Sequence, residues 1–137
     1  MSTEANIQIA KKAYADFGRG DIAALLAVLD DNVEWTTPGE GLPTSGTRLG
    51  KTEVARFFQT VAETWEFTVF EPRDYIAAGD QIAVCGSYTA TARSTGRQVK
   101  SEWVMVWKLR DGKVTRFQEY MDTAAARDAY SARVAAQ

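Results

Sequence analysis

Residues 107–123, WKLRDGKVTRFQEYMDT, hold two runs of alternating apolar and polar residues on either side of Asp111-Gly112. Such runs around an Asp-Gly pair are typical of a β-hairpin, so this stretch predicts two antiparallel strands. In the second run a single glutamate, Glu119, stands between two apolar residues, Phe117 and Met121. The direction in which this strand faces therefore decides whether Glu119 lies in a core or in water.

Two registers of this hairpin are open. A two-residue turn at 111–112 places Glu119 on the face away from Trp103, whereas a three-residue loop at 110–112 sets Trp103 opposite Glu119. A one-residue slip turns every side chain to the other face, so the apolar pattern should choose the register. We favour the three-residue loop, because it collects these residues on one surface: Trp103, Met105, Trp107, Leu109, Phe117 and Met121. The opposite, semi-polar face then carries Glu102, Val104, Val106, Lys108, Val114, Arg116, Gln118 and Tyr120.

The rest of the chain divides into helical patterns followed by strand patterns. Apolar spacing and a natural N-cap at Asp21 predict helices over 4–17, 21–30 and 51–65. A short strand at 33–37 precedes residues 38–50, whose glycines and prolines predict a loop that serves as a lid. The later strands are expected at 66–77, 81–93, 97–109 and 113–121, with a closing helix after them. Helices grouped before strands predict an α+β fold, in which an antiparallel sheet is covered on one face. The 137 residues form one domain, 1–137.

Composition excludes several classes of function. A net charge of −2, with acids and bases interspersed, gives no electrostatic footprint for nucleic acid. No apolar run approaches the roughly 20 residues that cross a membrane, and the N-terminal residues do not resemble a signal peptide. Cys85 is the only cysteine, which indicates a cytoplasmic location and a buried, unreactive thiol. There is no histidine, so acid–base chemistry falls to carboxylates, tyrosines or lysines, and we expect neither a metal nor another cofactor.

Three stretches resemble the SnoaL-like and ketosteroid-isomerase-like proteins of the nuclear transport factor 2-like superfamily. They are GDIAALLAVLDDNVEWTTPGEGLPTSG (20–46), EVARFF (53–58) and the hairpin quoted above. The resemblance implies a cone-shaped, curved, antiparallel or mixed sheet packed against three N-terminal helices, with a short C-terminal helix and an enclosed pocket. It does not imply one activity, because such proteins include isomerases, cyclases, dehydratases, epoxide hydrolases and non-catalytic binders.

Carried over residue by residue, the resemblance argues against the best-known reaction. The base, tyrosine and oxyanion acid of ketosteroid isomerase fall on Trp35, Ala13 and Met105 here, so ketosteroid isomerisation is not expected. The arginine and aspartate of an epoxide hydrolase fall on Trp103 and Met105. Dehydratases of the scytalone type need histidines, which this chain lacks.

Glu119 is then the best catalytic candidate, as a lone carboxylate whose pKa is raised in an aromatic pocket. The alternatives are an ion pair with an arginine (Arg48, Arg73 or Arg93), a cap for the closing helix, or plain exposure. Asp122 is the favoured N-cap of that helix. The expected substrate-binding residues are Tyr14, Trp35, Phe58, Trp103, Met105 and Phe117.

These features favour a small-molecule enzyme, of isomerase, cyclase or hydratase type, that moves a proton on an apolar cyclic or polyketide-like substrate through Glu119. The alternatives are a non-catalytic binder of a small apolar ligand and an assembly protein. In each case we expect a homodimer formed through the outer sheet face.

Overall fold

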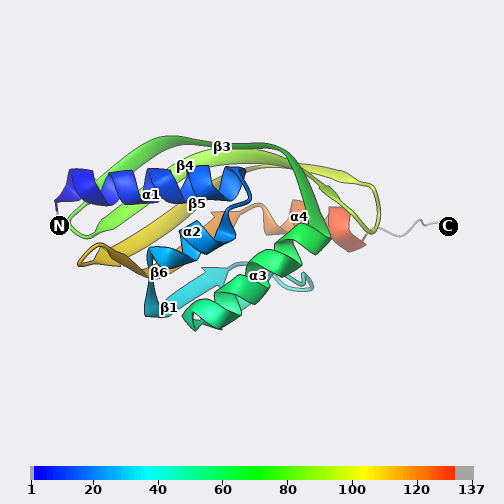
Figure 1. Ribbon diagram of the computed structural model, residues 1–137. Coiled ribbons are helices and arrows are strands. Elements are labelled where there is room, and N and C mark those ends of the chain that lie inside the picture. The colour runs from blue at the N-terminus through cyan, green and yellow to red at the C-terminus, as the bar shows by residue number, and fades with distance from the viewer. Residues whose placement is uncertain (1, 132–137) are drawn as a thin grey trace.

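The computed structural model describes residues 2–131 and shows an α+β fold of four helices and six strands within that range (Figure 1). The helices are α1 (Thr3–Gly18), α2 (Ile22–Ala27), α3 (Gly50–Thr64) and α4 (Thr123–Ser131). The strands are β1 (Leu29–Thr37), β2 (Gly46–Leu49), β3 (Trp65–Ala78), β4 (Gln81–Ala92), β5 (Gln98–Arg110) and β6 (Lys113–Met121). None of these helices is both long and apolar enough to span a membrane.

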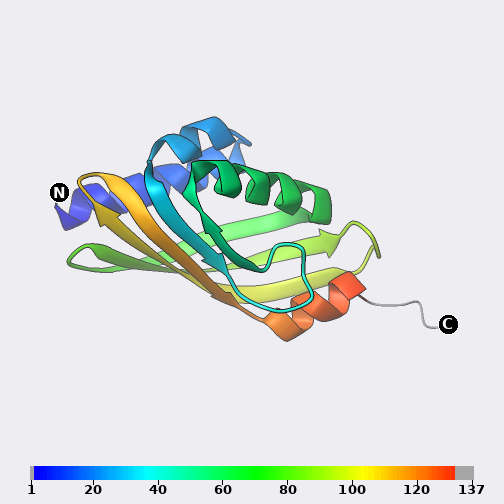
Figure 2. The ribbon, with the colours of Figure 1, turned by 90° about the horizontal axis from the view of Figure 1, so that it is seen from below.

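The strands form one mixed sheet in the order β2-β1-β6-β5-β4-β3. All neighbours are antiparallel except β1 and β6, which run parallel. The sheet curves, and α1, α2 and α3 lie on its concave side, while α4 continues from β6 at one end (Figure 2). The predicted fold class is therefore confirmed, including the three N-terminal helices and the short C-terminal one.

The helix predicted over 21–30 is shorter than the pattern suggests. Asp21 caps it as expected, since its side chain accepts a hydrogen bond from the Ala24 amide at 3.1 Å. However, α2 ends at Ala27, because Leu29 pairs with Val114 of β6 and begins a strand. Strand pairing across the fold thus overrides the local helical pattern.

The turn between β5 and β6 differs from the favoured prediction. Asp111 and Gly112 have φ angles of 52° and 79°, as a two-residue type I′ turn requires, and Leu109 pairs with Val114. The three-residue loop is wrong, and so is the outward position of Val114, which is fully buried.

Glu119 nevertheless faces inward, because a β-bulge follows the turn. Lys108 pairs with Arg116, so Thr115 is an extra residue on β6. The bulge shifts the register by one and turns the rest of β6 over. Met105, rather than Trp103, now lies opposite Glu119.

Two smaller predictions have different outcomes. Asp122 caps α4, since its carboxylate accepts a hydrogen bond from the Ala125 amide at 3.0 Å. The expected continuation of this helix into residues 132–137 lies outside the described residues. Cys85 is only half-buried, because it alternates with inward-facing Val84 and Gly86 and so lies on the outer face of β4.

Candidate functional site

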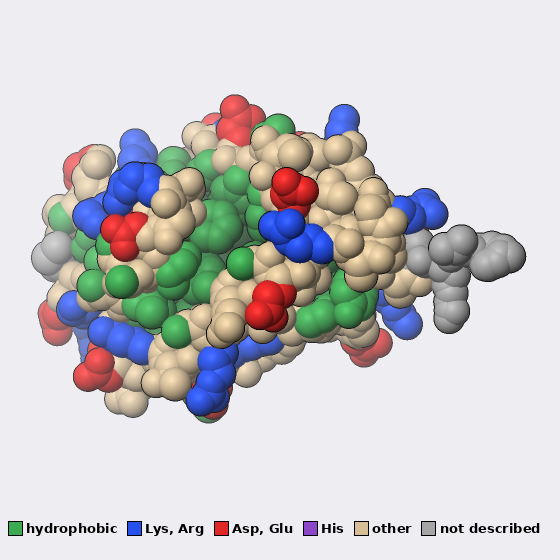
Figure 3. All heavy atoms as spheres, turned by 45° about the vertical axis from the view of Figure 1, so that its right-hand side comes forward, with side chains coloured by type: hydrophobic (Ala, Val, Ile, Leu, Met, Phe, Trp, Pro, Cys, Tyr) green, Lys and Arg blue, Asp and Glu red, His purple; other side chains and the backbone are tan. Residues whose placement is uncertain are grey.

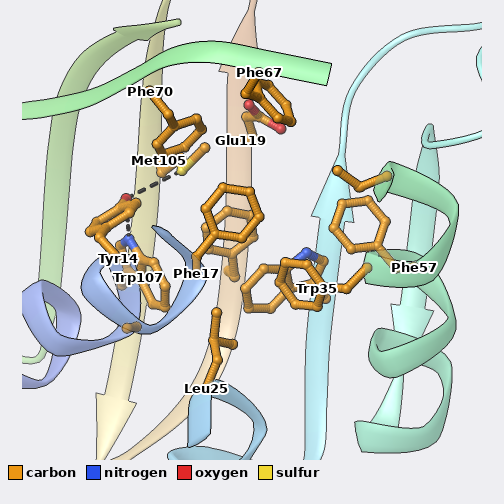
Figure 4. A pocket seen from close by; sticks show the side chains of 14 residues that line it. Tyr14, Phe17, Leu25, Trp35, Phe57, Phe67, Phe70, Met105, Trp107 and Glu119 are labelled. Carbon is orange, nitrogen blue, oxygen red and sulfur yellow. Dashed lines mark hydrogen bonds between the residues drawn. The ribbon is translucent and has the colours of Figure 1, made fainter. Parts of the chain in front are cut away.

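A cavity of about 80 Å³ lies between the helices and the concave face of the sheet. Its walls are almost entirely aromatic or aliphatic (Figure 4). The lining residues are Ala13, Tyr14, Phe17, Leu25, Trp35, Phe57, Phe58, Val61, Phe67, Phe70, Met105, Trp107, Phe117 and Glu119. Glu119 is the only charged residue in this lining.

The Glu119 carboxylate has no salt bridge or hydrogen-bond partner within residues 2–131. The three arginines considered as partners bind elsewhere: Arg48 to loop carbonyls, Arg73 to Glu71 and Glu102, and Arg93 to the Ala62 carbonyl. Desolvation in the apolar cavity raises the pKa of Glu119 from 4.5 to about 7. Both protonation states are therefore populated near neutral pH, as a group that accepts and returns a proton requires.

A second cavity, of about 60 Å³, meets the first at Glu119. It lies beneath the loop between β1 and β2, and its polar lining residues are Thr37, Thr44, Tyr88 and Glu119. Burial, and then the charge of Glu119, raises the pKa of Tyr88, so this phenol stays protonated. Glu119 thus stands at the junction of an apolar chamber and a smaller chamber that carries hydroxyl groups.

The loop over the second cavity is tied down by Arg48. Its guanidinium donates to the carbonyls of Pro43, Thr44 and Ser45 at 2.9 to 3.0 Å, and it lies 5.0 Å from the ring centre of Phe57. The loop therefore borders this chamber, and Arg48 joins three of its carbonyls, alongside hydrogen bonds from Thr37 to the Thr44 carbonyl and from Ser45 to the Pro38 carbonyl.

The Tyr14 hydroxyl is the second polar group at the main cavity. It accepts a hydrogen bond from the Trp107 indole at 2.9 Å and donates to the Met105 sulfur at 3.2 Å (Figure 4). Burial raises the pKa of Tyr14 well above its usual range, so it remains a donor at neutral pH. A thioether is a weak acceptor, which leaves this O–H group available to a stronger one.

A groove of about 610 Å³ adjoins the cavity on the helical side. It shares several lining side chains with the cavity, among them Tyr14, Phe17, Phe58 and Phe67. Figure 3 shows hydrophobic side chains gathered in a hollow on one face of the molecule, with charged residues around it. The groove therefore opens beside the cavity that Glu119 lines.

Comparison with known proteins places the chain in a family. Residues 10–117 match the SnoaL-like domain. The chain belongs to the SnoaL-like family. An uncharacterised protein of Mycobacterium tuberculosis H37Rv is 22% identical over 130 residues, covering 95% of this chain and 98% of the relative.

Solved structures agree on the fold. A nuclear transport factor 2-like (NTF2-like) protein from Burkholderia xenovorans LB400 is 39% identical, with a TM-score of 0.89 over 96% of this chain and 99% of that one. TerC, co-crystallised with polyporic acid, is 28% identical with a TM-score of 0.80 over 93% and 99% of the two chains. A protein from Mesorhizobium loti, described as a SnoaL-like polyketide cyclase, is 23% identical, with a TM-score of 0.70 over 83% of this chain and 97% of that one.

In this SnoaL-like protein, five of the six residues predicted to bind substrate border the main cavity: Tyr14, Trp35, Phe58, Met105 and Phe117. Trp103 does not border it. Its ring stacks behind the wall, 5.7 Å from the ring centre of Tyr14 and 5.3 Å from that of Phe70. It reaches this position because Gly86, its pairing partner on β4, has no Cβ to meet the indole.

Phe67 and Phe70 line the main cavity, although the sequence did not predict it. Strand alternation places residues three apart on opposite faces. A register shift between Phe67 and Val69 in β3 adds one residue, so both phenylalanines face inward. A bulge of this kind leaves no mark in an alternating pattern, whereas Phe57, Val61 and Trp107 were recognisable as inward-facing.

The positions of the absent ketosteroid-isomerase groups all border the cavity, as Ala13, Trp35 and Met105. Tyr14, which follows Ala13 on α1, also borders the cavity. The missing acids have no replacement at their own positions, and the one carboxylate in the lining comes from β6. No group of three or more residues suited to holding a metal ion occurs within residues 2–131.

Proposed function

We propose that this protein is a proton-transfer enzyme, of isomerase or cyclase type, for a small apolar cyclic or polyketide-like carbonyl compound. The observation that carries the proposal is Glu119: a single carboxylate without an ion partner in an otherwise apolar cavity. The family supports it, since the SnoaL-like domain and a neighbour named after polyketide cyclases belong to this fold.

In the proposed reaction, ionised Glu119 removes a proton from the carbon next to a substrate carbonyl. The electron pair of the broken C–H bond moves to the carbonyl oxygen and forms an enolate. Protonated Glu119 then returns the proton to another carbon in an isomerisation. In a cyclisation, the enolate carbon instead attacks a second carbonyl, and Glu119 protonates the new alkoxide. Each sequence needs only one group that passes between acid and base, and Glu119, with its pKa near 7, suits that role.

Tyr14 serves this reaction as the donor to the developing enolate oxygen. Its hydroxyl is oriented by the Trp107 indole, and its present acceptor, the Met105 sulfur, competes weakly with an oxyanion. A buried, pre-positioned donor of this type typically contributes a factor of about 10² to 10³ to the rate.

Acetophenone, a single-ring ketone with exchangeable methyl protons, tests the proposal. In D₂O the protein should accelerate loss of the methyl signal in proton NMR, and Glu119→Gln should abolish the acceleration while still binding the ketone. Glu102→Gln is the matched control, because Glu102 lies on the outer face of β5 and pairs with Arg73 at 2.8 Å. Exchange at the buffer rate in the wild-type protein would contradict the enzymatic proposal.

A second candidate, a non-catalytic binding protein, is favoured by a specific observation. Trp35 and Met105 stand where ketosteroid isomerase has its acids. The cavity therefore offers many apolar contacts to a ligand but only one carboxylate, Glu119, for acid–base catalysis. The co-crystal of TerC with polyporic acid supports ligand binding on this fold. Tight binding of acetophenone here, measured by calorimetry, together with unaccelerated acetophenone exchange would favour the binder.

The outer sheet face suits a second copy of the chain. A shallow groove of about 210 Å³ there is lined by Gln81, Val106, Lys108, Arg116, Gln118 and Tyr120, and Tyr120 is 52% exposed. We expect a homodimer through this face, located in the cytoplasm. Val104→Lys would then produce a monomer in sedimentation experiments, and a wild-type monomer would contradict the expectation.

A further inference from the structure

The Trp35 indole nitrogen is a buried donor without a partner. Trp35 is 3% exposed, and its Nε1 has no hydrogen-bond acceptor among residues 2–131. A tryptophan N–H buried in a protein normally finds an acceptor. Trp35 lines the main cavity, and Figure 4 shows its nitrogen on the ring edge that faces the space between Phe57 and Glu119.

The orientation of this indole is fixed by its aromatic neighbours. Its ring stacks on Phe117 at a centroid distance of 3.8 Å and an interplanar angle of 12°. Phe58 and Trp107 meet it edge-on at 5.5 and 5.8 Å. The N–H group therefore cannot turn to find an acceptor elsewhere, and it is pre-positioned for one that enters the cavity.

We propose that the Trp35 indole nitrogen donates a hydrogen bond to the ligand, so that the cavity selects a single-ring compound carrying a carbonyl-type oxygen over its hydrocarbon equivalent. This inference rests on the proposed function only in placing the ligand in the same cavity. It adds a ligand-recognising residue and a class of compound.

The size and polarity of the cavity fit that class. The main cavity is small, about 80 Å³, so it admits no more than a single ring, and a second cavity of about 60 Å³ borders it at Glu119. Figure 4 shows Trp35 and Tyr14 on opposite sides of the cavity. Each therefore offers a donor from a different side of the cavity, so one ligand oxygen accepts from one of them at a time, and the ring itself contacts the phenylalanines between them.

Trp103 provides a matched comparison within the same chain. It is 2% exposed, and its Nε1 also lacks a partner among the described residues. It does not border the main cavity, however, so no ligand there can satisfy it. Phenylalanine at either position removes a buried indole N–H and keeps an aromatic ring, but only the change at Trp35 alters what the ligand meets.

Acetophenone and α-methylstyrene form the probe pair, because they have nearly the same shape and differ in a C=O against a C=CH₂ group. The wild-type protein should bind acetophenone more tightly, and Trp35→Phe should reduce this preference by about tenfold, the worth of one hydrogen bond. Trp103→Phe should leave the preference unchanged. In the wild-type protein, the assigned Trp35 indole proton should move downfield in NMR with acetophenone and not with α-methylstyrene.

Several results would overturn the inference. One is an indole signal that stays in place on addition of acetophenone, as it would if a bound water already held the N–H group. Others are equal affinity of the wild-type protein for both probes, binding of neither, or an undiminished preference in Trp35→Phe. The proposed function is tested separately. Glu119→Gln should lose methyl exchange but keep the preference for acetophenone over α-methylstyrene.

Discussion

Replacement of Glu119 by glutamine should remove a pH dependence of stability that the cavity imposes. The pKa of this carboxyl is raised from 4.5 to about 7, which at about 1.4 kcal/mol per pKa unit penalises the ionised native state by about 3 kcal/mol. Between these two pH values the folded protein holds a proton that the unfolded chain has released. Folding stability must therefore fall as the pH rises through this window.

The contribution of Glu119 is fully favourable below about pH 4.5 and is lost above about pH 7. Other carboxyl groups also titrate, so the useful quantity is the difference between the wild-type protein and Glu119→Gln. Relative to the wild type, the variant should gain about 2.5 kcal/mol between pH 5 and pH 8. Urea unfolding at both pH values, followed by tryptophan fluorescence, measures this difference.

Glu102→Gln is the control, because its side chain is 81% exposed on the outer face and should show no comparable gain. If the stability of Glu119→Gln follows that of the wild-type protein at every pH, then Glu119 does not ionise in an apolar environment. The assignment of Glu119 as the acid–base group would then lose its physical basis.

Three further predictions concern Tyr14, Gly86 and Arg48. Tyr14→Phe should slow acetophenone exchange by about 10² to 10³ and change acetophenone affinity far less; equal losses in rate and affinity would mean that Tyr14 serves binding alone. Gly86→Ala should destabilise the protein to urea by about 1–3 kcal/mol, because a Cβ there overlaps the Trp103 ring and the Glu71 carbonyl. Gly18→Ala, with no atom within 4 Å of the new Cβ, should not destabilise the protein, and similar losses at both sites would refute the steric argument. Arg48→Lys should speed amide hydrogen exchange in residues 38–45, since lysine lacks the fork that joins three loop carbonyls; unchanged exchange would show that Arg48 does not hold the loop.

The fold was predictable because its signals are local and repeated. Four long strands separated by turn residues, preceded by amphipathic helices, leave few arrangements for the chain. The parallel pairing of β1 with β6 was not visible in the same way, because the two segments lie far apart in the sequence. That pairing also explains why the predicted second helix gives way to a strand at Leu29.

The site was predictable in composition and less so in geometry. The direction of Glu119 came from gathering apolar residues on one face, and that rule succeeded although the turn itself was assigned incorrectly. The bulge at Thr115 explains how Glu119 faces inward despite the two-residue turn. The turn alone would place the apolar residues of β6 on the outer face, and the extra residue returns them to the inner face. A second bulge, in β3, places both Phe67 and Phe70 in the cavity wall. The alternation of apolar and polar residues in that strand does not predict this bulge.

The apolar replacements at Trp35 and Met105 bear directly on what Glu119 can do. Acids at those positions would bring further charge to the same small cavity, and water with it, so the electrostatic environment of Glu119 would change. With an indole and a thioether there instead, desolvation is the dominant influence on this carboxyl and brings its pKa to about 7. The loss of the ketosteroid-isomerase acids therefore does not by itself argue against catalysis. Under the proposed function, proton transfer rests on the single carboxylate of β6, Tyr14 is the donor to the enolate, and Trp35 is the donor that recognises the ligand.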